Sequence, residues 1–291
     1  MPEPLAPNDY LPLVMAALAE DIGGGDATTL ALVPEDSIAT AVMTAREPLV
    51  MAGVDLALAA FEQVDERVEF NIEVLDGQEG GFGQALLRVQ GPTRALLTAE
   101  RTALNFVQRL AGVATLTAQF VEKIVGTQAQ ILDTRKTTPG WRVLEKYAVA
   151  CGGGTNHRMG LFDGVLIKDN HLAGRGDPLA VASAVTTARD AVPESLPVQV
   201  EVDTIEQLTD ALRAAPDMVL LDNMPPEELA RAVTIRDERA PGVLLEASGG
   251  ITLESLAEVA ATGVDRVSMG ALTHSVLNWD VGFDWVLSLI H

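Results

Sequence analysis

Cysteine, basic residues and long apolar runs are all scarce in this sequence. Its 291 residues include one cysteine, Cys151, which excludes an internal disulfide framework and favours a reducing compartment. No apolar run reaches the roughly 18 residues that a membrane span needs, and the N-terminal segment lacks the basic and apolar regions of a secretory signal. We therefore expect a cytoplasmic protein with no membrane partner, and we interpret Cys151 as a small buried residue rather than a nucleophile.

The charge is strongly negative, with one local exception. Twenty Lys and Arg against 41 Asp and Glu give a net charge of −21, which argues against nucleic acid as a partner. Residues 133–168, however, contain six Lys or Arg and three Asp or Glu, so the other 255 residues carry −24. A cationic stretch inside an acidic protein indicates a site for a small anionic ligand.

Several familiar catalytic signatures are also missing. The sequence contains no nucleophile elbow, no Walker motif and no Rossmann glycine fingerprint. It has no His/Cys cluster with zinc spacing, and we expect His274 and His291 to be incidental. The chemistry must therefore be sought in other combinations of residues.

The first 112 residues mix helical and strand-like patterns and predict an α+β N-terminal domain. The predicted helices cover 11–19 and 53–61, the predicted strands cover 37–45 and 68–75, and a glycine-rich connector covers 77–83. Apolar residues from Leu104 to Val113 then line one face of a helix that is expected to begin after Thr98 as its N-cap. The C-terminal segment 276–291 is a candidate addition to this domain.

Residues 113–275 alternate short apolar strands with helices, which is typical of a parallel sheet built from βαβ units. Six strands are predicted, at 130–133, 164–168, 198–202, 218–221, 243–246 and 266–268. This is too little chain for an eight-stranded barrel of about 250 residues. We expect an α/β fold with an incomplete (open) α/β barrel of about six to seven parallel strands as the catalytic domain, and a doubly wound sheet is the alternative.

Polar residues follow nearly every predicted strand, always at its carboxyl end, where parallel α/β folds bind ligands. Glycine and serine loops after the last two strands suit a phosphate, while arginine, lysine and histidine after the first two suit carboxylates or phosphates. Glu201 and Asp222 end successive strands and could bind Mg²⁺, hold sugar hydroxyls or act as an acid/base pair. The residues themselves thus indicate an enzyme that acts on a phosphorylated, polyanionic small molecule. The candidates are Thr134, Arg135, Lys136, His157, Arg158, Lys168, Glu201, Asp222, Ser248, Gly249, Gly250, Ser268, Met269 and Gly270.

The same segments resemble the quinolinate phosphoribosyltransferase family over nearly the whole chain and in the same order. The matching motifs are EDIGGGDAT (20–28), ERTALN (100–105), DTRKTTPGWR (133–142), GGGTNHRMGLFDGVLIKDNH (152–171), VEVDT (200–204), LLDNM (220–224), EASGGI (246–251) and DRVSMGALTHS (265–275).

This resemblance implies transfer of phosphoribose from phosphoribosyl pyrophosphate (PRPP) to quinolinate with decarboxylation, giving nicotinate mononucleotide for NAD biosynthesis, with Mg²⁺ as cofactor. It implies that Arg135, His157, Arg158 and Lys168 hold the two carboxylates, and that Lys136 and Lys168 face the pyrophosphate. It assigns the ribose hydroxyls and Mg²⁺ to Glu201 and Asp222, and the 5′-phosphate to the loops 248–250 and 268–270. It also implies a homodimer, or a higher oligomer, in which Arg101 reaches the site of a second subunit.

Three alternatives remain at this point. A related phosphoribosyltransferase could use another heterocyclic acid, and a non-catalytic sensor could keep the ligand site. A phosphate-binding lyase or aldolase could instead use Lys168 as a Schiff-base amine. The presence of Lys136, Lys168, Glu201 and Asp222 together favours catalysis over a sensor.

Overall fold

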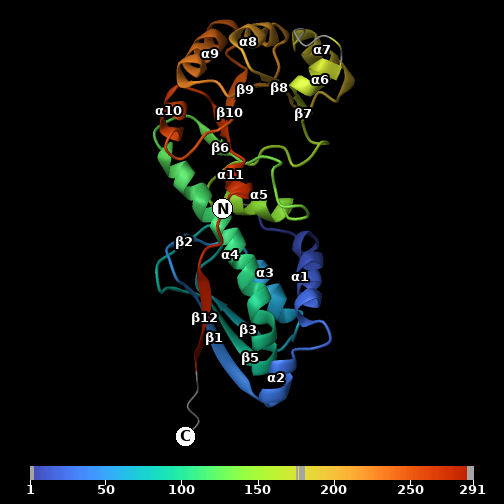
Figure 1. The fold of residues 1–291 in the computed structure, drawn as a ribbon, viewed down its shortest axis with the longest axis vertical. Coiled ribbons are helices and arrows are strands. Elements are labelled where there is room, and N and C mark those ends of the chain that lie inside the picture. The colour runs from blue at the N-terminus through green and yellow to red at the C-terminus, as the bar shows by residue number, and fades with distance from the viewer. Residues whose placement is uncertain (1–2, 175, 177–180, 287–291) are drawn as a thin grey trace. The chain divides into compact units, whose positions relative to one another are not determined.

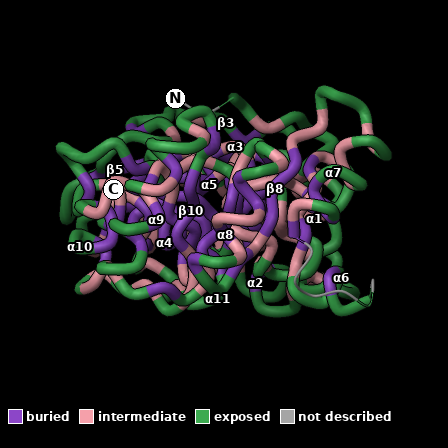
Figure 2. The backbone as a smooth tube through the Cα atoms, turned by 90° about the horizontal axis from the view of Figure 1, so that it is seen from above, coloured by how far each residue is buried: buried purple, intermediate pink, exposed green. Residues whose placement is uncertain are grey.

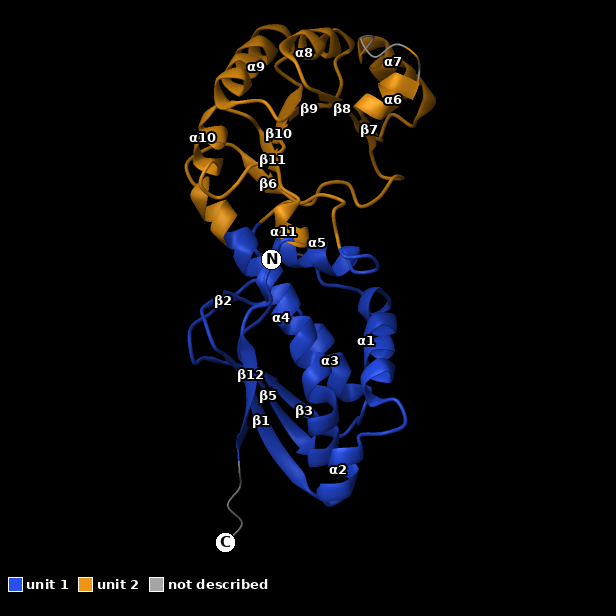
Figure 3. Cartoon of the chain, in the orientation of Figure 1, with its two compact units in different colours: residues 1–118, 138–153, 275–291 blue, residues 119–137, 154–274 orange. Residues whose placement is uncertain are grey.

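The computed structural model describes residues 3–174, 176 and 181–286, and these residues divide into two compact units (Figure 3). Unit 1 comprises the described residues within 1–118, 138–153 and 275–291, and unit 2 those within 119–137 and 154–274. The units are therefore interleaved along the chain, whereas we expected domains of 1–112 and 113–275. One helix runs without interruption through position 112, and residues 138–153 return to unit 1.

Unit 1 is an α+β unit, as predicted, and its strands pair antiparallel. A four-stranded sheet has the order β12-β1-β5-β3, and β2 pairs with β4. Strand β12 pairs antiparallel with β1, so the chain returns to the N-terminal sheet after residue 275 (Figure 1). The elements are α1 (Pro7–Ile22), α2 (Ala27–Leu32), β1 (Ile38–Ala45), β2 (Leu49–Val50), α3 (Val54–Glu62), β3 (Glu69–Ile72), β4 (Glu79–Gly80), β5 (Ala85–Pro92), most of α4 (Thr93–Lys123), α5 (Arg142–Cys151) and β12 (Val281–Val286).

The predicted start of the long helix was wrong. Helix α4 begins at Thr93, directly after β5, and Thr98 lies inside it. The apolar face already begins at Ala95 and Leu96, which are buried, so the helix has packing to gain from residues before Thr98. The Thr98 hydroxyl donates instead to Asp26, the residue that caps α2.

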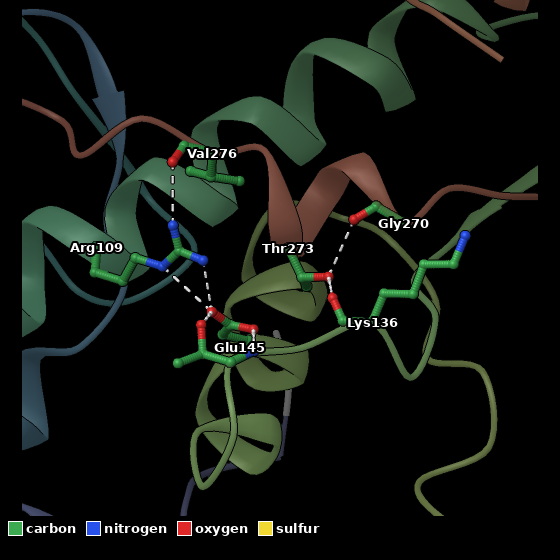
Figure 4. A network of polar contacts seen from close by, with 7 residues as sticks. Arg109, Lys136, Glu145, Gly270, Thr273 and Val276 are labelled. Atoms are coloured by element: carbon green, nitrogen blue, oxygen red, sulfur yellow. Dashed lines mark hydrogen bonds and ion pairs between the residues drawn. The ribbon is translucent and has the colours of Figure 1, made fainter. Parts of the chain in front are cut away.

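A buried ion pair joins α4 to α5 within unit 1 (Figure 4). Arg109 Nη2 lies 2.7 Å from Glu145 Oε1, and Arg109 Nη1 donates to the Val276 carbonyl at 3.1 Å. Glu145 is fully buried and also accepts from the backbone N–H of Thr138 at 3.0 Å. These bonds hold the chain just after each segment of unit 2 ends. One contact is at residue 138, after the segment 119–137, and the other is at residue 276, after the segment 154–274.

Cys151 closes α5 and is buried, as expected. Burial and the nearby charge of Asp76 raise the pKa of its thiol to about 12. The thiolate form, which is the nucleophile, is therefore negligible at neutral pH.

Unit 2 confirms the open barrel. Its strands have the order β6-β11-β10-β9-β8-β7 and all pair in parallel. The first strand, β6, thus lies beside the last, β11. The two edge strands of the described sheet, β6 and β7, do not pair with each other, so the barrel is open between them. A single parallel bridge from Leu132 to Thr155 partly fills that opening. The elements are β6 (Gln130–Leu132), β7 (Val165–Ile167), α6 (Asp169–Gly174), α7 (Val181–Ala191), β8 (Val198–Val202), α8 (Ile205–Ala211), the 3₁₀ turn η1 (Leu212–Ala214), β9 (Met218–Asp222), α9 (Pro226–Arg239), β10 (Leu244–Ser248), α10 (Leu256–Ala261), β11 (Arg266–Ser268) and α11 (Ala271–His274).

The strands of unit 2 are buried along most of their length, as Figure 2 shows for β8 and β10. Helices α7 to α10 lie on the outer side of the sheet (Figure 1), so the strands have protein on both faces. This burial explains why these strands are short apolar runs that end abruptly at polar residues. Of the helices in the described ranges, none combines the length and apolar character that crossing a bilayer would require.

Candidate active site

A cavity of about 690 Å³ in unit 2 is lined by residues at the carboxyl ends of all six strands. It brings together every predicted site residue except Arg101. Those that line it are Thr134, Arg135, Lys136, His157, Arg158, Lys168, Glu201, Asp222, Ser248, Gly249, Gly250, Ser268, Met269 and Gly270. Arg101 lies on α4 in unit 1, and its side chain is exposed.

Two arginines on one side of the cavity lie close enough for their charges to interact. Arg135 follows β6, and its buried Nε has no hydrogen-bond partner. Arg158 donates from Nη1 to the Gly164 carbonyl at 2.8 Å. Burial, and then the charge of Arg135, lower the pKa of the Arg158 guanidinium. Two desolvated cations side by side, one with an unsatisfied donor, favour the binding of an anion between them.

Acidic groups line the next strand ends. Lys168, directly after β7, forms an ion pair with Glu201 of β8. Asp222 ends β9 and accepts from the side-chain amide of Asn223 at 2.7 Å. The two carboxylates therefore lie at the ends of adjacent strands, and each already has a donor from the protein.

The glycine loops after β10 and β11 are shaped by their neighbours. Gly249 has φ +97°, and a Cβ there would lie 2.2 Å from Asn223 Oδ1, so only glycine fits. A Cβ at Gly270 would lie 2.8 Å from the Lys136 side chain and 2.9 Å from the ring of His274. The backbone amides of both loops thus border a space that a phosphate can enter closely.

Thr273 connects two of these loops (Figure 4). Its buried hydroxyl lies 2.7 Å from the Lys136 carbonyl and 3.2 Å from the Gly270 carbonyl. The loop that carries Lys136 is therefore held against the loop that follows β11.

A buried polar group forms part of the cavity wall in the barrel interior. Glu246 lies in β10 and is fully buried. It accepts from Gln199 of β8 and lies within ion-pair distance of Arg266 and His157. Residues from alternate strands meet in the interior in this way in barrel folds.

Sequence analysis missed three residues of this site. His274, which we expected to be incidental, also lines the cavity. Asn223, the residue after Asp222, has φ +53°, and its neighbour Asp222 was the only sequence signal that pointed to it. Glu246 was treated as the end of an apolar strand, although a carboxylate inside such a strand is itself a signal of a buried polar site. His291 lies outside the described residues.

Glu201 and Asp222 are the carboxylates of the cavity that could hold a metal ion. Among the described residues, no group of three or more His, Cys, Asp and Glu side chains is arranged to hold a metal ion. Glu201 and Asp222 supply oxygen ligands, which suit Mg²⁺, and a protein often offers this ion one or two carboxylates while the substrate's phosphates supply the rest. The residues present fit a metal that is held mainly by a phosphorylated substrate.

The fold and the cavity define an α/β-barrel enzyme whose site binds anions at the carboxyl ends of its strands. Family models agree with this class: residues 113–284 match the quinolinate phosphoribosyl transferase C-terminal domain, and residues 26–111 match its N-terminal domain. The chain belongs to the quinolinate phosphoribosyltransferase family.

Individual relatives support the family over the full length. The nicotinate-nucleotide pyrophosphorylase (carboxylating) of Mycobacterium leprae is 50% identical over 93% of this chain and 95% of its own. A quinolinate phosphoribosyltransferase (decarboxylating) of Nicotiana tabacum is 37% identical over 94% of this chain and 81% of its own. The solved nicotinate-nucleotide pyrophosphorylase of Francisella tularensis superposes with a TM-score of 0.90 at 38% identity, covering 97% of this chain and 98% of that one.

Proposed function

We propose that the cavity of unit 2 binds quinolinate and PRPP together and that the chain joins them. The products are nicotinate mononucleotide, pyrophosphate and CO₂. The observation that carries this assignment is the pairing of Arg135 and Arg158 with an unsatisfied donor, in one cavity with glycine loops shaped for a phosphate. An acceptor with two carboxylates and a donor with several phosphates match these two halves.

Quinolinate occupies the cationic half in this proposal. Arg135 and Arg158 bind its carboxylates, because a planar guanidinium can donate two parallel hydrogen bonds to each one. Lys168 lies at the next strand end and adds a third cation. His157 forms part of the same wall.

PRPP occupies the half formed by the later strands. The amides and hydroxyls of the loops 248–250 and 268–270 receive the 5′-phosphate, and Glu201 and Asp222 face the ribose. Lys136 and Lys168 face the pyrophosphate, and Thr134 supports the first of these loops by accepting from the N–H of Lys136 at 3.0 Å. The two substrates thus meet between the cationic wall and the two carboxylates.

The residues promote the reaction by charge and alignment. As the bond from C1′ to pyrophosphate breaks, positive charge develops on the ribose ring, and Glu201 and Asp222 stabilise it. The pyridine nitrogen then bonds to C1′. When the neighbouring carboxylate departs as CO₂, its bonding electron pair stays on the ring carbon, where the adjacent cationic nitrogen stabilises it. A proton from solvent then bonds to that carbon.

Mg²⁺ is part of the proposal as a partner of the phosphorylated substrate. Glu201 and Asp222 are the residues that would hold it, and it would neutralise charge on the pyrophosphate. Lys168 already compensates Glu201, so the protein's own contribution to the metal is small and most ligands come from the substrate and water.

A second subunit completes the site in the same proposal. Arg101 is exposed on α4 in unit 1, whereas the residues that line the cavity belong to unit 2, and we propose that it acts in another subunit of a cytoplasmic homodimer. Sedimentation velocity tests this point: a dimer is expected at assay concentrations, and an active monomer would refute it.

A turnover assay tests the proposed function. With Mg²⁺, PRPP and quinolinate, nicotinate mononucleotide and CO₂ should form in equal amounts, and nicotinate in place of quinolinate should not be used. Chelation of the metal should abolish turnover and weaken PRPP binding while quinolinate still binds, because the metal is held through the phosphates. Turnover of nicotinate in preference to quinolinate would contradict the proposal.

Replacing Thr273 with valine should separate the Lys136 loop from the loop after β11. Valine keeps the shape but leaves the Lys136 carbonyl without this donor, a change worth about 1–3 kcal/mol at a buried site. We expect a lower melting temperature and a KM for PRPP that rises about 3- to 10-fold, with little change in quinolinate KM. Thr273→Ser keeps the hydroxyl and is the matched control; equal defects in both variants would show that packing matters and the hydrogen bond does not.

A further inference from the structure

Glu246 is a fully buried carboxylate that borders the cavity, and one of its oxygens accepts a hydrogen bond and lies close to an arginine. Its Oε2 accepts from Gln199 Nε2 at 3.1 Å and lies 3.2 Å from Arg266 Nε. An arginine nitrogen can only donate, so this end of the side chain must present an acceptor. Burial favours the neutral acid, but hydrogen bonding and the nearby positive charge of Arg266 outweigh it and lower the pKa of Glu246 below its ordinary value. The side chain is therefore a carboxylate at neutral pH.

The other oxygen of Glu246 lies toward His157. Oε1 accepts no hydrogen bond from the described residues, and His157 Nε2 lies within ion-pair distance of it, at 3.4 Å. On the far side of the imidazole, Nδ1 accepts the backbone N–H of Arg158 at 2.7 Å. A ring nitrogen that accepts carries no proton, so the proton of the neutral imidazole sits on Nε2, the ring nitrogen that lies 3.4 Å from Glu246 Oε1.

The position of His157 is also set by its backbone. Its N–H donates to Asp133 Oδ1 at 2.8 Å, and Asp133 is fully buried directly after β6. His157 is therefore held through its backbone N–H and at Nδ1, its Nε2 lies toward Glu246, and the residue lines the cavity. Arg158, the next residue, owes part of its own placement to the same ring.

We infer that Glu246 is a positioning residue that holds His157 in the Nε2–H tautomer and so fixes the wall on which quinolinate binds. The inference rests on the proposed assignment of quinolinate to this cavity. It deepens that assignment, because it makes His157 and Arg158 one preorganised unit set by a buried carboxylate.

The substitution Glu246→Gln tests this arrangement sharply, because it keeps the shape and changes only the pattern of donors. The amide oxygen must face Arg266, so the amide NH₂ faces His157 Nε2. Two donors then oppose each other. If the imidazole moves its proton to Nδ1, the conflict shifts to the N–H of Arg158. One of the two contacts of His157 must be lost.

Nitrogen-15 NMR of histidine-labelled protein reads the tautomer directly. The chain contains four histidines, and the spectrum of His157→Gln identifies the resonance that belongs to His157. The wild-type protein at pH 7.5 should show the Nε2–H form of His157. A Nδ1–H or doubly protonated ring in the wild type would overturn the inference, and this measurement does not depend on any variant's folding. In Glu246→Gln the Nε2–H signature should be lost or averaged.

Kinetics connect the tautomer to binding. Glu246→Gln should raise the KM for quinolinate about 10-fold or more, as is typical when a partner that orients a ligand-binding side chain is lost, while the KM for PRPP stays within about twofold. Gln199→Leu is the matched control, since Gln199 contacts Glu246 from the opposite side, and it should leave both the tautomer and the quinolinate KM unchanged.

Three results would overturn the positioning role: an unchanged quinolinate KM in Glu246→Gln, equal losses for both substrates, or the same defect in Gln199→Leu. If the wild-type protein fails to use quinolinate but shows the Nε2–H tautomer, the proposed function fails while the hydrogen-bonding arrangement stands.

Discussion

Replacing Arg135 with alanine is expected to weaken quinolinate binding about 100-fold, which corresponds to the loss of two charged hydrogen bonds of about 1.5 kcal/mol each. The buried Nε of Arg135 has no partner in the protein, so its hydrogen-bonding capacity is free for a ligand. PRPP binding should change less than threefold, because the phosphate loops are formed by other strands. Titration calorimetry with each substrate measures both numbers.

The same substitution should not destabilise the unliganded protein. Arg135 lowers the pKa of Arg158 by charge repulsion, after the larger effect of burial, so its removal relieves an unfavourable interaction. We expect an unchanged or higher melting temperature without ligand. Arg213→Ala is the control, because Arg213 is an exposed arginine paired with Asp210 outside the cavity. Equal losses of affinity for quinolinate and PRPP in Arg135→Ala would contradict the assignment of this wall.

Asp222→Asn should lower kcat about 100- to 1000-fold, the range found when one preorganised electrostatic group is removed from a catalytic site. Asparagine keeps an oxygen that can accept from the Asn223 side chain, so the end of β9 should retain its shape. In the proposed role of Asp222, what is lost is the negative charge that would stabilise the cationic ribose. Quinolinate KM should stay within about threefold.

Steady-state kinetics with both substrates varied test this prediction, and circular dichroism checks the fold. A fall in kcat/KM that arises only from a higher KM for PRPP would show that Asp222 binds the substrate or its metal without stabilising the transition state. Normal turnover in Asp222→Asn would remove Asp222 from the catalytic set.

The barrel was largely predictable because its strands are buried on both faces. The strands at 198–202 and 266–268 occur with the predicted bounds, since a short apolar run flanked by polar and glycine residues has few other stable structures. Convergence of the strand-end residues then follows from parallel pairing alone. This is why Lys168, Glu201 and Asp222 could be placed together without any contact information.

Other features depend on contacts that no local pattern reveals. The start of α4 at Thr93 reflects packing of Ala95 and Leu96, and the return of 138–153 to unit 1 includes the pairing of Glu145 with Arg109. The tautomer of His157 depends on Glu246, which is 89 positions away in the chain. Sequence motifs show which residue types are present, whereas their hydrogen-bond partners require the fold.

The central claim is that one cavity holds quinolinate on the wall of Arg135 and Arg158 and PRPP on the glycine loops. A crystal structure of the protein with quinolinate, grown without PRPP, tests it most directly. The account predicts both carboxylates within hydrogen-bond distance, about 2.7–3.2 Å, of these two guanidinium groups, with the pyridine nitrogen facing the empty space beside Glu201 and Asp222. Quinolinate bound instead on the loops 248–250 and 268–270 would contradict it.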